Sequence, residues 1–310
     1  MEVFEGVDAY DPEDSPSVLS IGNFDGVHLA HREICRFIKE EAVRRGGRSV
    51  ILTFEPHPLS VVAPERRPPL MTTLEEKLAR LETQNIDAVV IEKFTPTLAQ
   101  TVARDFVRQI IGEGLKASLV VIGFNFRFGK GRAGNVELLQ EEGASAGFET
   151  HVLDPYMFEG RRVSSTEIRK LLLGGAVEEA ARLLGQHHLI EGEVIHGDGR
   201  GRQIGIPTAN VDYPSILIPE NGVYACRVQI DGREGLRHPA VTNIGNRPTF
   251  DKKQVTLETH LLDWEGDLYG KSIRVEFVSR LREEKKFSGP QELVRQIHVD
   301  IENGRKKLNV

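Results

Sequence analysis

The chain has 310 residues, 39% of them hydrophobic, and a formal net charge of -6. This length and composition suit one large domain or two ordinary ones with hydrophobic cores, and we expect two. The negative charge argues against a general nucleic-acid binder, because such proteins neutralise phosphates with a basic surface. The two cysteines, Cys35 and Cys226, are too few for a disulfide framework and form no C-x-x-C pair. A reducing cytoplasm is therefore the expected compartment.

The N-terminal segment MEVFEGVDAYDPEDSP is acidic and has no apolar core of signal-peptide length. No later apolar run approaches the length of a membrane span. We therefore expect a soluble cytoplasmic protein without a membrane partner, and the composition leaves its oligomeric state open.

Strands and helices alternate over the first half of the chain. Apolar runs predict buried strands at 18–21, 48–54, 86–91, 117–122 and 149–153. Helical spacing predicts helices between them, the first beginning near His31 and another preceded by a capping box of Thr72 and Glu75. This alternation predicts a doubly wound parallel sheet, in which ligands bind beyond the carboxyl ends of the strands.

Glycine-rich or polar segments follow three of these strands. They are GNFDGVH (22–28), EPHP (55–58) and GFNFRFGKGRAGN (123–135). The carboxyl ends of parallel strands meet at one edge of a sheet, so we expect one crevice lined by all three. The P-loop motif G-x-x-x-x-G-K-[ST] is absent, and no G-x-G-x-x-G comes directly after a strand as a dinucleotide fingerprint would, which disfavours a P-loop kinase and a dinucleotide site.

The segment SIGNFDGVHLAHREI (20–34) joins a glycine turn to a helix start. Free backbone N–H groups and the positive end of the helix dipole favour phosphate there. His28 and His31 are three residues apart and so present their imidazoles on one face, but no third metal ligand stands at a recognisable spacing. We therefore predict a phosphate cradle, with further contacts from Gly22, Phe24 and Gly26.

A second candidate for phosphate binding is VSSTEIRKLL (163–172). Ser164 or Ser165 can cap the helix that follows. Arg169 does not belong to the apolar face of this helix, so we expect it to be exposed toward the crevice. An arginine and hydroxyl groups at a helix start suit a triphosphate, and Thr166 supplies a third hydroxyl. The alternative is a purely structural role, in which the hydroxyl groups only cap the helix and Arg169 forms a surface ion pair.

The pairing of G-x-F-D-G-x-H-x-x-H with the distant S-S-T-x-I-R resembles the nucleotidyltransferases that transfer AMP from ATP. With TFEPHP and GFNFRFG, the chain is similar to the bacterial bifunctional riboflavin kinase/FAD synthetases. The resemblance implies an FMN adenylyltransferase domain over 1–185. It also implies flavin contacts from His57, Asn125, Phe126 and Phe128. From the residues alone, the phenylalanines equally suit an apolar strand edge, and His57 suits a rigid turn between prolines.

From residue 188 onward the apolar runs are short and are separated by Gly, Pro, Asn and Asp. Alternation in YACRVQI and VTLETHLL indicates half-buried antiparallel strands, so we expect a small β-barrel. Pro290 suits the first turn of a C-terminal helix, whose residues Leu293, Ile297 and Ile301 would pack across the barrel.

The loop GDGRGRQIGIPTAN (197–210) is the richest in glycine. Close approach to phosphate is predicted for Gly197, Gly199, Arg200, Gly201 and Gly205. Thr208 and Asn210 offer oxygens of the kind that hold Mg²⁺ beside phosphates. Glu258, on a predicted strand, is a carboxylate that could accept a proton from an attacking hydroxyl.

G-x-P-T-A-N with a downstream E-T-H is similar to the riboflavin kinase module, so the resemblance runs from about residue 18 to 308. It implies a kinase barrel over 186–310, substrates riboflavin, FMN and ATP, products FMN and FAD, and Mg²⁺ as metal. One alternative is a nucleotidyltransferase for another phosphorylated acceptor, with the barrel as a non-catalytic binding module. Another is a non-enzymatic flavin or nucleotide sensor.

Overall fold

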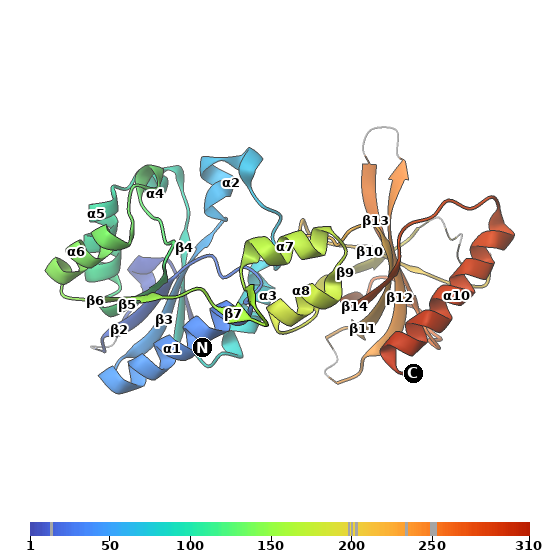
Figure 1. Cartoon of the computed structure of the whole chain (residues 1–310), viewed down its shortest axis with the longest axis horizontal. Coiled ribbons are helices and arrows are strands. Elements are labelled where there is room, and N and C mark those ends of the chain that lie inside the picture. Colours follow the sequence, from blue (N-terminus) through green and yellow to red (C-terminus); the bar gives the residue numbers. More distant parts are fainter. Residues whose placement is uncertain (13–14, 198, 200, 202–203, 233–234, 249–252) are drawn as a thin grey trace. The chain divides into compact units, whose positions relative to one another are not determined.

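A computed structural model of the chain describes residues 1–310 apart from 13–14, 198, 200, 202–203, 233–234 and 249–252. The described residues form two compact units. The first comprises Met1–Pro68 and Thr72–Ser164, and the second comprises Pro69–Met71 and Ser165–Val310. Each unit is built on a sheet of its own (Figure 1).

The first unit contains a parallel sheet of six strands in the order β1-β4-β3-β2-β5-β6. The strands are β1 Glu2–Glu5, β2 Ser17–Ile21, β3 Arg48–Glu55, β4 Ala88–Lys93, β5 Ala117–Gly123 and β6 Glu149–Leu153. The predicted parallel sheet is thereby confirmed. Edge strand β1 was not predicted, because four residues within an acidic segment give no apolar run.

Helices cover both faces of this sheet (Figure 1). Alternate residues of β2 enter different cores, since successive strand side chains point to opposite faces: Val18 packs with α1 and α3, whereas Leu19 packs with η3 and α6. The longer helices are α1 Leu29–Arg45, α3 Leu74–Glu82, the π-helical η3 Phe106–Gly114 and α6 Val136–Ala146. Shorter elements are α2 Pro58–Val62, α4 Pro96–Ala99, α5 Ala103–Asp105 and the hairpin of β7 Met157–Phe158 and β8 Arg161–Arg162.

Two helix starts differ from the predictions. Helix α1 begins at Leu29, before His31, because Nδ1 of His28 accepts the backbone N–H of His31 at 3.4 Å and so caps the helix. Thr73 caps α3 by accepting the N–H of Glu76 at 3.2 Å. The predicted capping box of Thr72 and Glu75 is therefore wrong by one residue, and Thr72 has other partners.

The second unit contains a closed antiparallel barrel in the order β10-β13-β12-β11-β14-β9, which confirms the predicted β-barrel. Its strands are β9 His188–Ile195, β10 Ala209–Asp212, β11 Gly222–Ile230, β12 His238–Pro248, β13 Lys253–Leu261 and β14 Ser272–Arg282. The sequence interpretation assigned Ala209 and Asn210 to the glycine-rich loop, whereas both lie in β10. This four-residue strand is held by pairing with β9 on one side and β13 on the other, which sequence periodicity cannot reveal.

Among the described residues of this unit, three helices accompany the barrel: α7 Ser165–Leu173, α8 Val177–Leu184 and α10 Pro290–Leu308. Helix α8 packs against β9 and β14, and α10 packs against β11, β12 and β14. Pro290 occupies the first turn of α10 as predicted, and Ile301 joins Val241 and Leu262 in a small apolar cluster.

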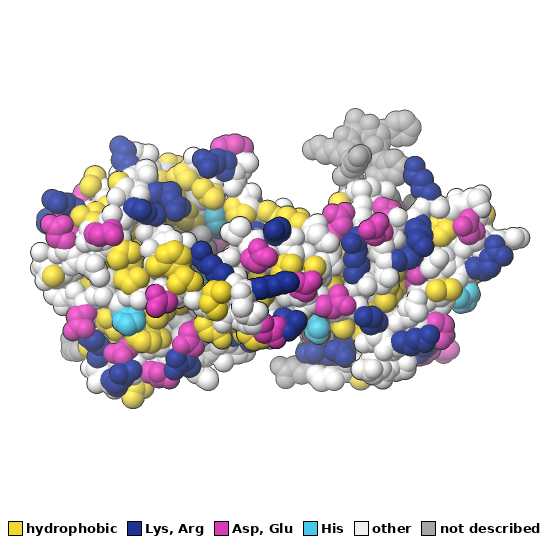
Figure 2. Space-filling model, viewed as in Figure 1, with side chains coloured by type: hydrophobic (Ala, Val, Ile, Leu, Met, Phe, Trp, Pro, Cys, Tyr) yellow, Lys and Arg dark blue, Asp and Glu magenta, His cyan; other side chains and the backbone are white. Residues whose placement is uncertain are grey.

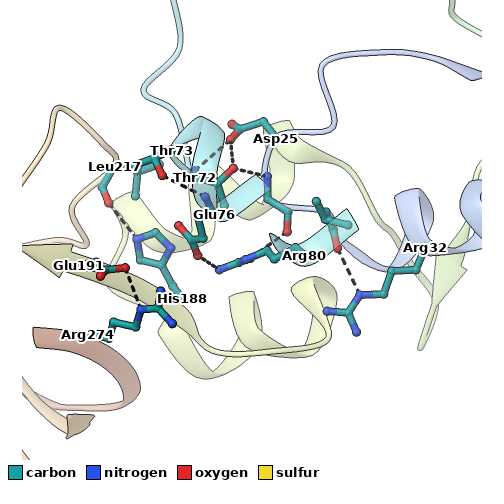
Figure 3. A network of polar contacts seen from close by, with 12 residues as sticks. Asp25, Arg32, Thr72, Thr73, Glu76, Arg80, His188, Glu191, Leu217 and Arg274 are labelled. Atoms are coloured by element: carbon teal, nitrogen blue, oxygen red, sulfur yellow. Dashed lines mark hydrogen bonds and ion pairs between the residues drawn. The ribbon is translucent and has the colours of Figure 1, made fainter. Parts of the chain in front are cut away.

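Basic and acidic side chains are interspersed on the visible face of the second unit (Figure 2). Within this unit, Arg274 pairs with Glu191 at 2.8 Å, and the buried His188 lies with Nε2 2.9 Å from the carbonyl oxygen of Leu217 (Figure 3). Among the described residues, no helix is both long enough and apolar enough to cross a membrane.

Candidate functional site

The strand order of the first unit defines where a ligand would bind. From β2 the chain continues to β3 and β4 on one side of the sheet, and later to β5 and β6 on the other side. Ligands of such sheets bind at this switch point, beyond the carboxyl ends of the strands. Gly22 follows β2 and Gly123 ends β5. The fold therefore brings the segments 22–28 and 123–129 to the same edge.

His28 and His31 are stacked at the start of α1. Their ring centroids are 3.6 Å apart and the ring planes differ by 12°. His28 is 4% exposed, and the ring of the buried Phe24 lies 4.8 Å from that of His31. Both imidazoles thus stand at the positive end of the helix dipole, where an anion is favoured. The arrangement suits the predicted phosphate cradle, with Gly22 and Gly26 in the preceding turn.

His57 is held against the same loop. It caps α2, where its Nδ1 accepts the backbone N–H of Leu59 at 3.1 Å. The side-chain amide of Asn23 lies 3.1 Å from its Nε2. The ring is 8% exposed, so its orientation is set by these contacts. Its role as a flavin contact stays a prediction.

The three phenylalanines that follow β5 have different surroundings, and they lie beyond the strand, not within it. Phe128 is buried in the core against Phe106, with ring centroids 5.7 Å apart. Phe126 is half-buried and stacks on Phe128, whereas Asn125 is exposed. Phe124 is 43% exposed, and the guanidinium of Arg162 lies 4.7 Å from its ring centroid. Phe124 was not among the predicted site residues. Only its contact with Arg162, on the β7–β8 hairpin, distinguishes it from the other two phenylalanines, and the sequence does not reveal that contact.

The predicted hydroxyl and arginine cluster lies at the start of α7. Ser164 precedes the helix, Ser165 is its first residue and Thr166 is exposed. Nε of the half-buried Arg169 donates to the carbonyl oxygen of Pro69 at 2.9 Å. The two units divide between Ser164 and Ser165, so Arg169 belongs to the second unit and His31 to the first. A joint site of these residues stays a prediction.

In the barrel, strand register brings three distant polar residues into one row. Glu258 on β13 is paired with Asn210 on β10 and with Asn243 on β12. All three are half-buried, while Ala209 and Thr259, the neighbours of Asn210 and Glu258, are buried. The row therefore lies on the outer surface of the barrel. Asn243 was missed by sequence reasoning, because only the register of β12 and β13 relates it to Glu258.

Two glycines make room for the predicted metal-binding side chains. A Cβ on Gly197 would lie 2.2 Å from Nδ2 of Asn210, and one on Gly201 would lie 2.4 Å from the carbonyl oxygen of Ile206 and 3.1 Å from Oγ1 of Thr208. The hydroxyl of Thr208 and the amide of Asn210 are thus packed against glycine backbone. Hydroxyl and amide oxygens are suitable ligands for Mg²⁺. Gly199 and Gly205 are exposed, and Arg200 lies outside the described residues.

Each of the three residues Glu258, Thr259 and His260 has a partner on another segment. Glu258 is paired with Asn210 and Asn243 as described above, and Oγ1 of Thr259 lies 3.1 Å from Oγ1 of the buried Thr242. Nδ1 of His260 donates to the carbonyl oxygen of Pro207 at 2.7 Å. Thr208 and Thr259 also line a pocket together with residues of the segment 264–269. The barrel therefore offers a carboxylate, two oxygen donors and an adjoining pocket.

Comparison with known proteins agrees with both halves of this description. Residues 10–167 match the FAD synthetase family and residues 184–308 match the riboflavin kinase family. The bifunctional riboflavin kinase/FMN adenylyltransferase of Escherichia coli (strain K12) is 39% identical over 283 residues, 91% of this chain and 90% of that protein. The protein of that name from Bacillus subtilis (strain 168) is 37% identical over 294 residues, 93% of this chain and 91% of that protein.

A solved structure is also similar over nearly the whole chain. A crystal structure described as a macrolide-efflux protein from Streptococcus pneumoniae has a TM-score of 0.87 and 29% sequence identity, and the match covers 98% of both chains. The family matches leave out residues 168–183, which hold most of α7 and α8. These helices lie in the second compact unit, and the predicted boundary at residue 185 stays a prediction. With two family matches and relatives that align over nearly its full length, the chain belongs to the bifunctional riboflavin kinase/FMN adenylyltransferases.

Proposed function

We propose that the two reactions of bifunctional flavin synthesis use separate groups of residues in this chain. Riboflavin is phosphorylated by ATP at the barrel to give FMN, and FMN then receives AMP from a second ATP to give FAD and pyrophosphate. The observation that carries the kinase assignment is the strand register that aligns Glu258 with Asn210. The stacked His28 and His31 at the start of α1 support the assignment of the adenylylation site.

In the kinase reaction, Glu258 accepts the proton of the ribityl 5′-hydroxyl. The oxygen then bonds to the γ-phosphorus of ATP, and the bond between that phosphorus and ADP breaks. Thr208 and Asn210 would hold Mg²⁺, which when bound neutralises charge on the phosphates. The glycines of the 197–205 loop let the backbone approach the phosphates closely. Asn243, in the same row as Glu258, is a further polar group available to orient the substrate.

In the adenylylation reaction, the FMN phosphate is already an anion, so it needs no strong base. Its oxygen bonds to the α-phosphorus of ATP, and the bond to pyrophosphate breaks. His28 and His31 hold ATP and stabilise the charge that develops on the phosphates. That Ser165 and Arg169 act on the same ATP stays a prediction. Asn125 and Phe126, which follow β5, contact the flavin. Because this site lies at the switch point of the sheet, it uses different residues from those of the barrel.

Variants of Glu258 and His31 test this division. Glu258→Ala should abolish FMN formation and leave conversion of supplied FMN to FAD, whereas His31→Ala should do the reverse. The two products are separated by chromatography after incubation with ATP and Mg²⁺. Glu191→Ala, at an exposed position of β9, serves as the control for Glu258→Ala. Loss of both activities in each variant would contradict the assignment.

The wild-type protein distinguishes the remaining alternatives. FAD formation without any riboflavin phosphorylation or binding would favour a barrel that only binds a ligand. Flavin or nucleotide binding without product formation would favour a sensor. We also propose a cytoplasmic location, because both reactions consume ATP and the two cysteines are free thiols.

A further inference from the structure

The loop that leads from β2 to α1 has an unfavourable backbone. Phe24 has φ 48° and Val27 has φ 42°, in the left-handed region where non-glycine residues are uncommon. For the β-branched Val27 this conformation is especially unfavourable. Such conformations persist only where surrounding contacts hold them, and they concentrate at functional sites. The contacts that hold this loop therefore bear on the site that it forms.

Thr72, just before α3, is joined to the loop by three hydrogen bonds. Its Oγ1 donates to Oδ1 of Asp25 and accepts the N–H of Gly26, both at 3.1 Å. Its backbone N–H also donates to Oδ1 of Asp25 at 3.1 Å. Thr72 and Asp25 are each 4% exposed. Figure 3 shows these bonds together with that of Arg80, whose Nη1 donates to the carbonyl oxygen of Gly26 at 2.9 Å.

Lys77 is the second buried contact. Its side chain lies in the interior, with the residue 7% exposed. Nζ is 3.2 Å from Oγ1 of Thr53 and 3.4 Å from the carbonyl oxygen of Asn23. Thr53 in turn donates to that carbonyl oxygen at 3.3 Å. Burial lowers the pKa of Lys77, against the effect of the nearby carboxylates of Glu55 and Asp25. A buried ammonium group is costly, which suggests a role other than stability.

Lys77 and Arg80 are three residues apart and so lie on one face of α3. Each donates to a backbone carbonyl of the loop, at Asn23 and Gly26 respectively. Together with Thr72, they hold the loop on both sides of Phe24 and immediately before Val27. The next residue is His28, which caps α1 and stacks on His31.

We propose that Thr72 and Lys77, supported by Arg80, are positioning residues for adenylylation. They hold the strained loop in the conformation that aims the start of α1 and its two histidines at the nucleotide. This inference rests on the proposed assignment of His28 and His31 to ATP. None of the three residues was among the predicted site residues, because their contacts join segments about 50 positions apart in sequence.

Two matched pairs of variants test the proposal in the full-length protein. Thr72→Val removes the hydroxyl at nearly constant shape, whereas Thr72→Ser retains it. Lys77→Met removes the buried charge, and Lys116→Met makes the same change at an exposed position before β5. The readouts are KM for ATP and kcat with FMN supplied, and riboflavin phosphorylation by the same preparations.

Thr72→Val and Lys77→Met should raise KM for ATP or lower kcat so that kcat/KM falls at least about tenfold, as expected for a misplaced binding group. Thr72→Ser and Lys116→Met should stay within about twofold of wild type, as should riboflavin phosphorylation by all four variants. If Lys77→Met does not fold, the comparison of Thr72→Val with Thr72→Ser tests the proposal. Equal losses in Thr72→Ser and Thr72→Val would overturn the proposal, as would unchanged kinetics in Thr72→Val.

His31→Ala in the same series separates this inference from the assignment on which it rests. A loss of adenylylation in His31→Ala, with Thr72→Val and Lys77→Met unchanged, would overturn the positioning role alone. Unchanged adenylylation in His31→Ala would instead overturn the assignment of that segment to ATP.

Discussion

Nδ1 of His260 lies 2.7 Å from the carbonyl oxygen of Pro207. A carbonyl oxygen can only accept, so Nδ1 carries the proton and donates. The contact joins β13 to the residue immediately before Thr208. Because His260 is two residues from Glu258, the strand that carries the proposed base also fixes the segment that carries a proposed metal ligand.

His260→Leu should therefore lower FMN formation, by about 10-fold to 100-fold, as is usual when the partner of a ligand-bearing segment is lost. His260→Asn should retain much of the activity, because its amide nitrogen can reach the position of Nδ1. The rate of riboflavin phosphorylation against Mg²⁺ concentration checks both variants. Equal activity of His260→Leu and wild type would show that the Pro207 contact does not position Thr208.

Gly197→Ala should impair the same reaction for a steric reason. The added Cβ would lie 2.2 Å from Nδ2 of Asn210, so the amide or the loop must move. Gly289→Ala is the control in the same unit, since nothing lies within 4 Å of a Cβ at that position. We expect at least about a tenfold loss of kcat/KM for ATP in FMN formation for Gly197→Ala. No loss relative to Gly289→Ala would mean that Asn210 can shift without consequence.

The sequence predicted the elements with the most regular patterns. The strand at 149–153 coincides with β6 Glu149–Leu153, and Pro290 marks the first turn of α10. The sequence did not predict the strands whose formation depends on pairing with segments distant in the chain. Strands β1 and β10 have four residues each and are held by neighbours distant in sequence.

The site was predictable to a similar extent. Motifs identified Glu258 and Asn210 separately, but only the barrel register shows them paired. Thr72 was interpreted as a helix cap, which is its most frequent role at such a position. Its actual partner, Asp25, is 47 residues away, and no local pattern points to it.

The ion pair of Arg282 and Asp300 should stabilise the second unit. Nε of Arg282 lies 2.9 Å from Oδ1, and Nη2 lies 2.8 Å from Oδ2, of an Asp300 side chain that is 4% exposed. Asp300→Ala leaves the guanidinium without its buried partner, so the free energy of unfolding should fall by about 3 kcal/mol.

Urea unfolding followed by the fluorescence of Trp264, the single tryptophan, reports on this unit. Asp263→Ala, which removes the partner of Arg305 in an exposed pair, should change the transition little. Similar shifts of the urea midpoint in the two variants would indicate that burial does not strengthen the ion pair of Arg282 and Asp300.

The thiols of Cys35 and Cys226 should be inert in the folded protein. Both side chains are fully buried, and burial raises the pKa of each thiol from an ordinary 9.0 to about 12. The thiolate is the reactive form, so iodoacetamide should label neither cysteine at pH 8 and both in denaturant, as counted by mass spectrometry. Between pH 9 and pH 12 the unfolded chain loses these protons before the folded chain does. Their contribution to the free energy of unfolding is therefore complete below pH 9 and is lost as the pH rises toward 12. Rapid labelling of either cysteine in the native protein at pH 8 would show that its unit opens far more often than this packing implies.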